Sequence, residues 1–349
     1  MVQDSILSVR DLRTHFFTRS GVARAVDGVS LDLRPGETLG VVGESGSGKT
    51  VTSLSILRLV PPPGRIVSGE ILFEGRNLAM LPEEDLRGIR GKQISMVFQD
   101  PMSSLNPFLT IGDQVAETLL VHQNSGERLS RRDALQRAAE VLGKVGIPDP
   151  ESRLSDFPHR FSGGMRQRVM IAMALISNPK VLIADEPTTA LDVTIQAQVL
   201  DLFERIQSEF GTSILLITHN LGIVAGIADH VAVMYAGKVV EYAPTEELFR
   251  NPRHPYTLAL LRAVPRPGDP NQTVAPIPGS PPDLTHLPPG CSFYDRCPFR
   301  EDRCREKAPP LESKEDGQPK EPSEPEEPRH LARCWVDVDQ SRDRKGVEV

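Results

Sequence analysis

The sequence lacks several features that would place it in other classes of protein. Its longest apolar run, residues 169–176, is far shorter than the roughly 20 residues that a membrane-spanning helix needs. No basic segment followed by an apolar one opens the chain, so we do not expect a secretion signal. Cysteine is absent from residues 1–290, and the four cysteines all follow that stretch.

The chain also lacks an excess of basic charge. It carries 40 basic and 47 acidic residues, a net charge of −7, which gives no electrostatic reason to expect nucleic-acid binding. Hydrophobic residues make up 39% and charged residues 25%, the balance of a soluble globular protein. A length of 349 residues predicts one large domain with appendages.

A phosphate-binding loop is the most informative segment that is present. Its pattern, G-x-x-x-x-G-K-[ST], is matched by Gly43, Glu44, Ser45, Gly46, Ser47, Gly48, Lys49 and Thr50. An apolar stretch at 38–42 predicts a strand before the loop, and residues 50–59 predict a helix after it. In that context backbone N–H groups and the helix N-terminus would bind phosphate, Lys49 would reach the β- and γ-phosphates, and Thr50 would ligate Mg2+. A glycine-rich turn without a ligand is the alternative.

Two further apolar stretches place polar residues where strands end. Residues 181–184 predict a strand that delivers Asp185 and Glu186 at its carboxyl end, the edge where open α/β sheets bind ligands. Asp185 suits Mg2+, and Glu186 can orient or deprotonate a water beside the γ-phosphate. A third strand at 213–217 leads to His219, a candidate contact to the same phosphate.

The order of these motifs resembles the ATPase subunit of an ABC transporter, and over nearly the whole chain its dipeptide/oligopeptide-import branch. The motifs of that family fall on the Q-loop glutamine Gln99, the signature residues Ser162, Gly163 and Gly164, the D-loop Asp192 and the switch histidine His219. Many members of the family have glutamine at the position of Met165. In having methionine there, the chain resembles the first of the two ATPases in such importers. Phe16 is expected to stack on adenine, with Phe17 as its rival.

The resemblance implies an α/β fold with a RecA-like P-loop NTPase core. We expect residues 1–98 and 167–250 to form this ATP-binding core, and residues 99–166 to form an inserted helical subdomain with the Q-loop and signature. The insert reads as helical because Ser130 and Asp133 match a capping box, followed by apolar residues at helical spacing. Residues 251–349 would form a C-terminal extension, irregular from Pro265 to Pro289 and with a disordered loop at 312–330.

The four cysteines suggest a metal site rather than disulfides. The spacing of Cys291, Cys297, Cys304 and Cys334 leaves an iron–sulfur cluster, zinc and thiols without a metal open. The resemblance favours a [4Fe–4S] cluster, because members of this branch carry such a segment, with Cys334 the least certain ligand. Since the phosphate loop belongs to the core, replacing these cysteines is expected to leave nucleotide binding intact.

The resemblance implies that the chain hydrolyses ATP at the cytoplasmic side of the cell membrane and that hydrolysis drives peptide uptake. The catalytic residues implied are Glu186, His219 and Gln99. The Mg2+ ligands implied are Thr50, Gln99 and Asp185. The partners implied are a second, related ATPase, two transmembrane permease subunits and an extracytoplasmic peptide-binding protein. Import of nickel, glutathione or opines is an alternative, and a soluble ABC ATPase without a transport role is another.

Overall fold

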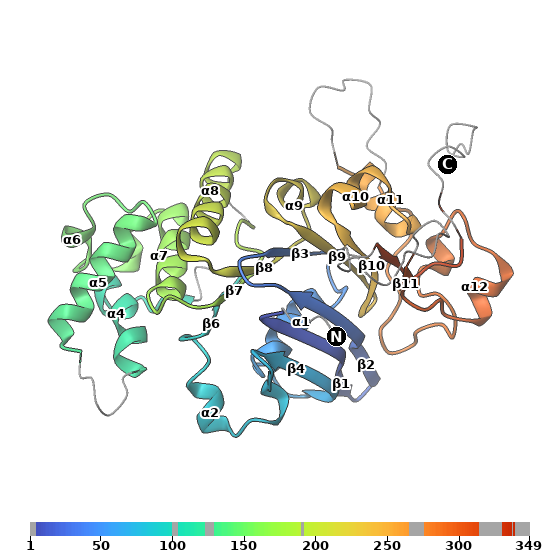
Figure 1. The fold of residues 1–349 in the computed structure, drawn as a ribbon, viewed down its shortest axis with the longest axis horizontal. Helices are drawn as coiled ribbons and strands as arrows, with labels where there is room; N and C mark the ends of the chain where they lie inside the picture. The colour runs from blue at the N-terminus through green and yellow to red at the C-terminus, as the bar shows by residue number, and fades with distance from the viewer. Residues whose placement is uncertain are drawn as a thin grey trace, which may run out of the picture. The chain divides into compact units, whose positions relative to one another are not determined.

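The computed structural model describes residues 5–99, 104–122, 129–189, 192–264, 276–313, 330–336 and 338. By its internal contacts the chain divides into two compact units whose segments alternate along the sequence. Unit 1 comprises Met1–Leu7, Leu33–Thr38 and Leu72–Ile217, and unit 2 comprises Ser8–Asp32, Leu39–Ile71 and Thr218–Val349. Both units combine helices with strands (Figure 1), as the predicted α/β class requires.

Three parallel strands form the sheet of unit 1. They are β6 (Ile94–Val97), β7 (Val181–Asp185) and β8 (Ser213–Thr218), and β7 lies between the other two. The strands at 181–184 and 213–217 predicted from the sequence are therefore confirmed. Because Val97 pairs with Ala184 and Asp185 with Ile217, the carboxyl ends of these strands meet at one edge.

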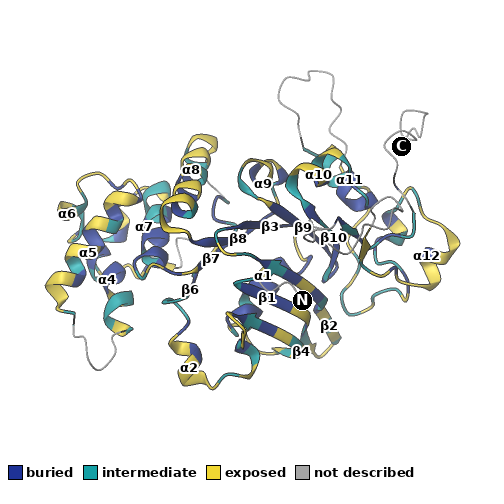
Figure 2. Cartoon of the chain, viewed as in Figure 1, coloured by how far each residue is buried: buried dark blue, intermediate teal, exposed yellow. Residues whose placement is uncertain are grey.

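Helices make up most of the rest of unit 1. The larger ones are α4 (Ile111–Val121), α5 (Arg131–Lys144), α7 (Gly163–Leu175) and α8 (Val193–Phe210). The predicted capping box forms in part: the Ser130 hydroxyl accepts a hydrogen bond from the Asp133 N–H at 3.2 Å, and the Asp133 carboxylate accepts one from the Ser130 hydroxyl at 2.7 Å. Helices α4, α5 and α7 pack against one another, and Figure 2 shows α5 with a buried inner face and an exposed outer one.

The short elements of unit 1 connect these parts. They are β5 (Arg76–Asn77), η1 (Leu78–Met80), α2 (Glu83–Arg87), α6 (Pro150–Arg153) and η2 (Pro158–Arg160).

Unit 2 holds two groups of strands. In the first, β1 (Leu7–Thr18) lies between β2 (Gly21–Leu33) and β4 (Gly64–Phe73). In the second, β3 (Thr38–Val42) runs parallel to β9 (His230–Tyr235), which pairs antiparallel with β10 (Lys238–Pro244). Two short strands, β12 (Leu331–Ala332) and β11 (Glu312–Ser313), continue this group beyond β10.

The helices of unit 2 include α1, which follows the phosphate loop. Their bounds are α1 (Lys49–Ile56), α9 (Leu221–Ile227), α10 (Thr245–Arg250), α11 (Pro255–Arg262), η3 (Tyr294–Arg296) and α12 (Asp302–Glu306). The strand at 38–42 and the helix after the loop agree with the sequence-based prediction, although the helix ends earlier than residue 59.

The C-terminal region of unit 2 shares a core with β9. The rings of Tyr235 and Tyr256 have centroids 4.6 Å apart, and Phe293 packs against both at 5.2 and 5.4 Å. All three side chains are buried. Aromatic groups of this size bury enough area to fix the segments that carry them, so α11 and η3 are anchored to β9.

The structure agrees only in part with the irregular segments that the sequence predicts for the C-terminal region. Residues 276–289 form no helix or strand, as expected, whereas residues 265–275 lie outside the described part. The prediction of a disordered loop at 312–330 is wrong for its first two residues, because Glu312 and Ser313 pair with β12. Residues 314–329 lie outside the described residues.

A buried carboxylate joins β10 to the segments that pack on it. The Glu241 side chain is 0% exposed and accepts hydrogen bonds from the backbone N–H groups of Arg253 (2.6 Å) and His254 (3.0 Å). The Nε2–H of His330 donates to the same carboxylate at 2.7 Å. Removing a buried charge from such a set leaves several donors without an acceptor, which is costly.

We therefore expect Glu241→Ala to lower the free energy of unfolding by about 3 kcal/mol, because three donors lose their acceptor inside the protein. Glu246→Ala is the matched control, since the Glu246 side chain is 68% exposed in α10 and pairs with the exposed Arg250. Denaturant unfolding monitored by circular dichroism measures both variants. Equal stabilities for the two would contradict this role of Glu241.

Candidate active site

Close packing of backbone against backbone shapes the phosphate loop. Gly43 and Gly48 have φ values of 152° and 103°, which side chains rarely tolerate. A Cβ on Gly43 would lie 2.2 Å from the Met234 carbonyl oxygen, and one on Gly48 would lie 2.3 Å from the Ala25 carbonyl oxygen. Only glycine fits at these two positions, so the loop is held tightly between β2 and β9.

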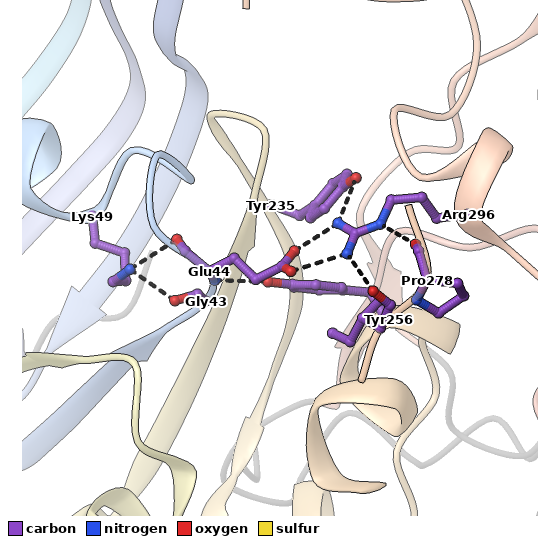
Figure 3. A network of polar contacts seen from close by, with 8 residues as sticks. Gly43, Glu44, Lys49, Tyr235, Tyr256, Pro278 and Arg296 are labelled. Atoms are coloured by element: carbon purple, nitrogen blue, oxygen red, sulfur yellow. Dashed lines mark hydrogen bonds and ion pairs between the residues drawn. The ribbon is translucent and has the colours of Figure 1, made fainter. Parts of the chain in front are cut away.

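The loop presents the groups that a phosphate needs. Helix α1 begins at Lys49, and no side chain caps its N-terminus, so the N–H groups of the first turn can meet phosphate oxygens. The Lys49 ammonium donates to the carbonyl oxygens of Gly43 (2.8 Å) and Glu44 (3.0 Å), which places it inside the loop (Figure 3). Ser47 Oγ is buried and has no hydrogen-bond partner among the described residues. These features fit a nucleotide phosphate.

The C-terminal region holds the same loop from its other side. The Glu44 N–H donates to the Tyr256 hydroxyl at 2.8 Å, and the Glu44 carboxylate accepts two hydrogen bonds from Arg296, at 2.7 and 2.9 Å (Figure 3). Arg296 directly precedes Cys297. We expected cysteine replacement to leave nucleotide binding intact because the phosphate loop belongs to the core. That premise is incomplete, because Arg296, next to Cys297, contacts the loop at Glu44.

A second cluster forms at the carboxyl edge of the unit 1 sheet. Asp185 ends β7 and is 2% exposed. The next side chain, Glu186, accepts hydrogen bonds at the same carboxylate oxygen from Gln99 Nε2 (3.0 Å) and from the Thr189 hydroxyl (2.9 Å). The parallel pairing of β6 with β7 brings Gln99 and Glu186 together, although 87 positions separate them.

The backbone of Glu186 is strained. Its φ is 48°, in the left-handed region that non-glycine residues seldom occupy, and its N–H donates to the Ile217 carbonyl at 2.8 Å. Strain of this kind costs about 1–3 kcal/mol and persists where the surrounding structure fixes a functional side chain. The Glu186 carboxylate is thus turned toward Gln99 and Thr189 by both backbone and side-chain contacts.

The signature and D-loop residues lie beside each other in unit 1. The Ser162 hydroxyl caps α7 by accepting from the Met165 N–H at 3.3 Å, and Asp192 caps α8 by accepting from the Ile195 N–H at 2.9 Å. A Cβ on Gly164 would lie 2.8 Å from Ile195, whereas one on Gly163 would meet nothing within 4 Å. The D-loop residues Ala190 and Leu191 lie outside the described part.

The remaining predicted nucleotide contacts are His219 and the two phenylalanines. His219 follows β8 and is exposed. The half-buried ring of Phe16 packs so closely on Gly64 that a Cβ there would lie 2.6 Å from it. The ring of Phe17 is covered by the Arg65 guanidinium, 4.0 Å from its centroid. Phe17 therefore already has a cationic stacking partner, and Phe16 does not show one.

All four cysteines line one cavity in unit 2. None of them forms a disulfide. Burial raises the pKa of the Cys297 thiol to about 12, and the other three cysteines add to this effect. Among the described residues, no three His, Cys, Asp or Glu side chains are grouped closely enough to hold a single metal ion.

Comparison with known proteins decides the family. The model of the ABC transporter family matches residues 26–189, and that of the oligopeptide/dipeptide transporter C-terminal region matches residues 240–304. The dipeptide transport ATP-binding protein DppD of Bacillus subtilis is 50% identical over 95% of this chain and 95% of its own length. The oligopeptide transport ATP-binding protein OppD of Escherichia coli is 50% identical over 88% of this chain and 90% of its own.

The chain belongs to the ABC transporter ATPases. Among solved structures, the dimeric bacterial ABC transporter cassette MJ0796 is similar to it with a TM-score of 0.62 and 26% identity, over 68% of this chain and 98% of the cassette. The predicted ABC ATPase fold is thereby confirmed. In the part of this ABC ATPase that the structure describes, no helix is long and apolar enough to cross a membrane.

Sequence reasoning named the motif residues of this ABC ATPase but missed the side chains that contact them. Neither Arg296 nor Tyr256 was predicted to touch the phosphate loop, since 252 and 212 positions separate them from Glu44. Thr189 was also missed as a partner of Glu186. The His-Pro-Tyr-Thr stretch at 254–257 is the local signal in the sequence that could have led to Tyr256.

Lys49→Ala removes the ammonium that lies inside the loop. We expect it to weaken binding of Mg-ATP roughly 10- to 100-fold, the effect of losing a hydrogen-bonded charge. Lys180→Ala is the control, because Lys180 forms an exposed ion pair with Glu74. Titration calorimetry with a non-hydrolysable nucleotide measures both. Unchanged affinity in Lys49→Ala would rule out the loop as the nucleotide site.

Proposed function

We propose that this chain is the ATP-hydrolysing subunit of an ABC importer that takes up di- and oligopeptides across the cytoplasmic membrane. The observation that carries the proposal is that peptide-transport ATP-binding proteins match this chain over nearly its whole length, including the C-terminal region. A phosphate loop and a polar sheet edge supply the chemistry that such a subunit needs.

The nucleotide would be held mainly by the phosphate loop. The backbone N–H groups of residues 43–50 and the α1 N-terminus would bind the phosphate oxygens, and Lys49 would neutralise the β- and γ-phosphates. Bound Mg2+ would offset the negative charge of the phosphates during transfer, with Thr50, Gln99 and Asp185 as its protein ligands. Phe16, rather than the already stacked Phe17, would lie against adenine.

Glu186 is the proposed general base. The Gln99 amide and the Thr189 hydroxyl donate to its carboxylate and so orient the group that would accept a proton from water. His219 would contact the γ-phosphate from the end of β8. The signature residues Ser162, Gly163 and Gly164, with Asp192 beside them, would complete the site of a second ATPase subunit.

The partners follow from this arrangement. A second, related ATPase would pair with this chain, and two transmembrane permease subunits would receive the motion of the predicted helical subdomain, residues 99–166. An extracytoplasmic peptide-binding protein would deliver the substrate. The chain would then lie at the cytoplasmic side of the cell membrane, attached through the permeases. The ATP-binding core would comprise residues 1–98 and 167–250, and the extension residues 251–349.

We also propose a [4Fe–4S] cluster in the extension, held by Cys291, Cys297, Cys304 and Cys334. Their position around one cavity supports this, since such a cluster takes four cysteine thiolates. The cluster would join residues 291–304 of the extension to Cys334. One zinc ion is the alternative.

Glu186→Gln in the assembled transporter tests the hydrolytic role. The amide keeps the size of the side chain but cannot accept the proton, so turnover should fall on the order of 100-fold or more while ATP binding persists. Glu209→Gln, at an exposed position of α8, is the control. Nearly normal hydrolysis by Glu186→Gln would exclude it as the base.

Iron analysis tests the cluster. Protein purified without oxygen should contain about four irons per chain with an equal amount of sulfide, and should absorb broadly near roughly 400 nm. Cys291→Ser should abolish that absorbance. One zinc per chain without iron would instead favour the zinc site.

A further inference from the structure

Arg296 is a buried cation whose partners all belong to unit 2. Its side chain is 4% exposed, and both terminal nitrogens donate to the Glu44 carboxylate. The Nε–H donates to the Pro278 carbonyl at 2.8 Å, and one terminal nitrogen also donates to the Tyr235 hydroxyl at 3.3 Å. Such a two-pronged contact fixes the carboxylate in orientation as well as in distance.

Tyr256 fixes the backbone of the same loop residue. Its hydroxyl accepts from the Glu44 N–H, and its ring is buried against Tyr235 and Phe293. Its own N–H donates to His254 Nδ1 at 3.0 Å, at the start of α11. Glu44 is therefore held at its side chain by η3 and at its backbone by α11.

Glu44 is also joined to the phosphate-binding lysine. Lys49 donates to the Glu44 carbonyl, so a shift of this residue would move one of the oxygens that place the ammonium. Tyr256 holds the N–H of Glu44 and Arg296 holds its carboxylate, and both groups are joined to that carbonyl through the Cα atom. Figure 3 shows the continuous line of contacts from Arg296 through Glu44 to Lys49.

The cysteine segment determines where Arg296 lies. The Tyr294 N–H donates to the Cys291 carbonyl at 3.0 Å, and the Cys297 N–H donates to the Tyr294 carbonyl at 3.2 Å. Arg296 is thus the last residue of a short helical turn whose first residue is hydrogen-bonded to Cys291 and which Cys297 follows directly. If the cysteines change their positions, the guanidinium moves with the turn.

We propose that Arg296 is a positioning residue for ATP binding, and that through it the four-cysteine segment sets the affinity of the phosphate loop. The inference rests on the proposed ATPase function. It adds that the extension acts on the nucleotide site within one chain, through Glu44.

The test measures kcat and the KM for ATP in the assembled transporter carrying Arg296→Met. KM should rise on the order of tenfold and kcat should stay within about twofold, because the loop holds the phosphates equally in the ground and transition states. Arg250→Met is the matched control, since Arg250 also pairs with a glutamate but at an exposed site. Wild-type KM in Arg296→Met would overturn the proposal.

A double-mutant cycle separates positioning from simple loss of stability. Arg296→Met combined with Glu44→Gln should raise KM no further than the stronger single change, because both remove the same contact. Additive effects would contradict action through Glu44. Tyr256→Phe keeps the buried ring but loses the hydroxyl, and should raise KM roughly threefold. If Arg296→Met does not fold, Tyr256→Phe tests whether contacts to Glu44 set the KM for ATP. An unchanged KM in Tyr256→Phe would then count against the proposal.

A cysteine variant tests whether the four-cysteine segment sets the affinity of the phosphate loop. Cys297→Ser should raise KM in the same direction as Arg296→Met, and the two changes together should not add. Wild-type KM in Cys297→Ser would limit the effect to Arg296 and refute control by the cysteine segment. A wild-type transporter that does not hydrolyse ATP would instead refute the proposed function itself.

Discussion

The structure depends on how closely the backbone of the phosphate loop approaches its neighbours. At Gly43 and Gly48 a single added carbon would lie 2.2 and 2.3 Å from the carbonyl oxygens of Met234 and Ala25. The loop is therefore confined between the ends of β9 and β2, and α1 can begin at Lys49 with its first N–H groups not bonded by any side-chain cap. Phosphate binding, and the place of Lys49, follow from that confinement.

The opposite side of the loop shows that the C-terminal extension belongs to the nucleotide-binding unit as much as the phosphate motif does. Glu44 meets Tyr256 from α11 and Arg296 from η3, and both are packed on a buried aromatic core with Tyr235. The buried carboxylate of Glu241 holds the backbone at the start of that region. An extension that follows the core in sequence is in this way part of its support.

Local signals in the sequence predicted several strands, the phosphate loop and a helix cap. Apolar runs predicted β3, β7 and β8, glycine spacing predicted the loop, and the cap of α5 was predicted from Ser130. Contacts between distant segments could not be predicted, because no periodicity encodes which side chain meets which across 252 positions, as Arg296 and Glu44 do. The strained backbone of Glu186 was likewise invisible, since residue type alone gives no sign of a left-handed φ.

In the proposed transporter, a second ATPase subunit completes the active site of this chain. The most direct measurement is ATP hydrolysis by the purified chain alone and by the transporter reconstituted in vesicles with its permeases, its second ATPase and its peptide-binding protein. The account predicts slow hydrolysis by the chain alone, and hydrolysis by the vesicles that rises with added peptide and accompanies its uptake. Rapid hydrolysis by the monomer, proportional to its concentration, together with vesicles that neither respond to peptide nor take it up, would contradict it.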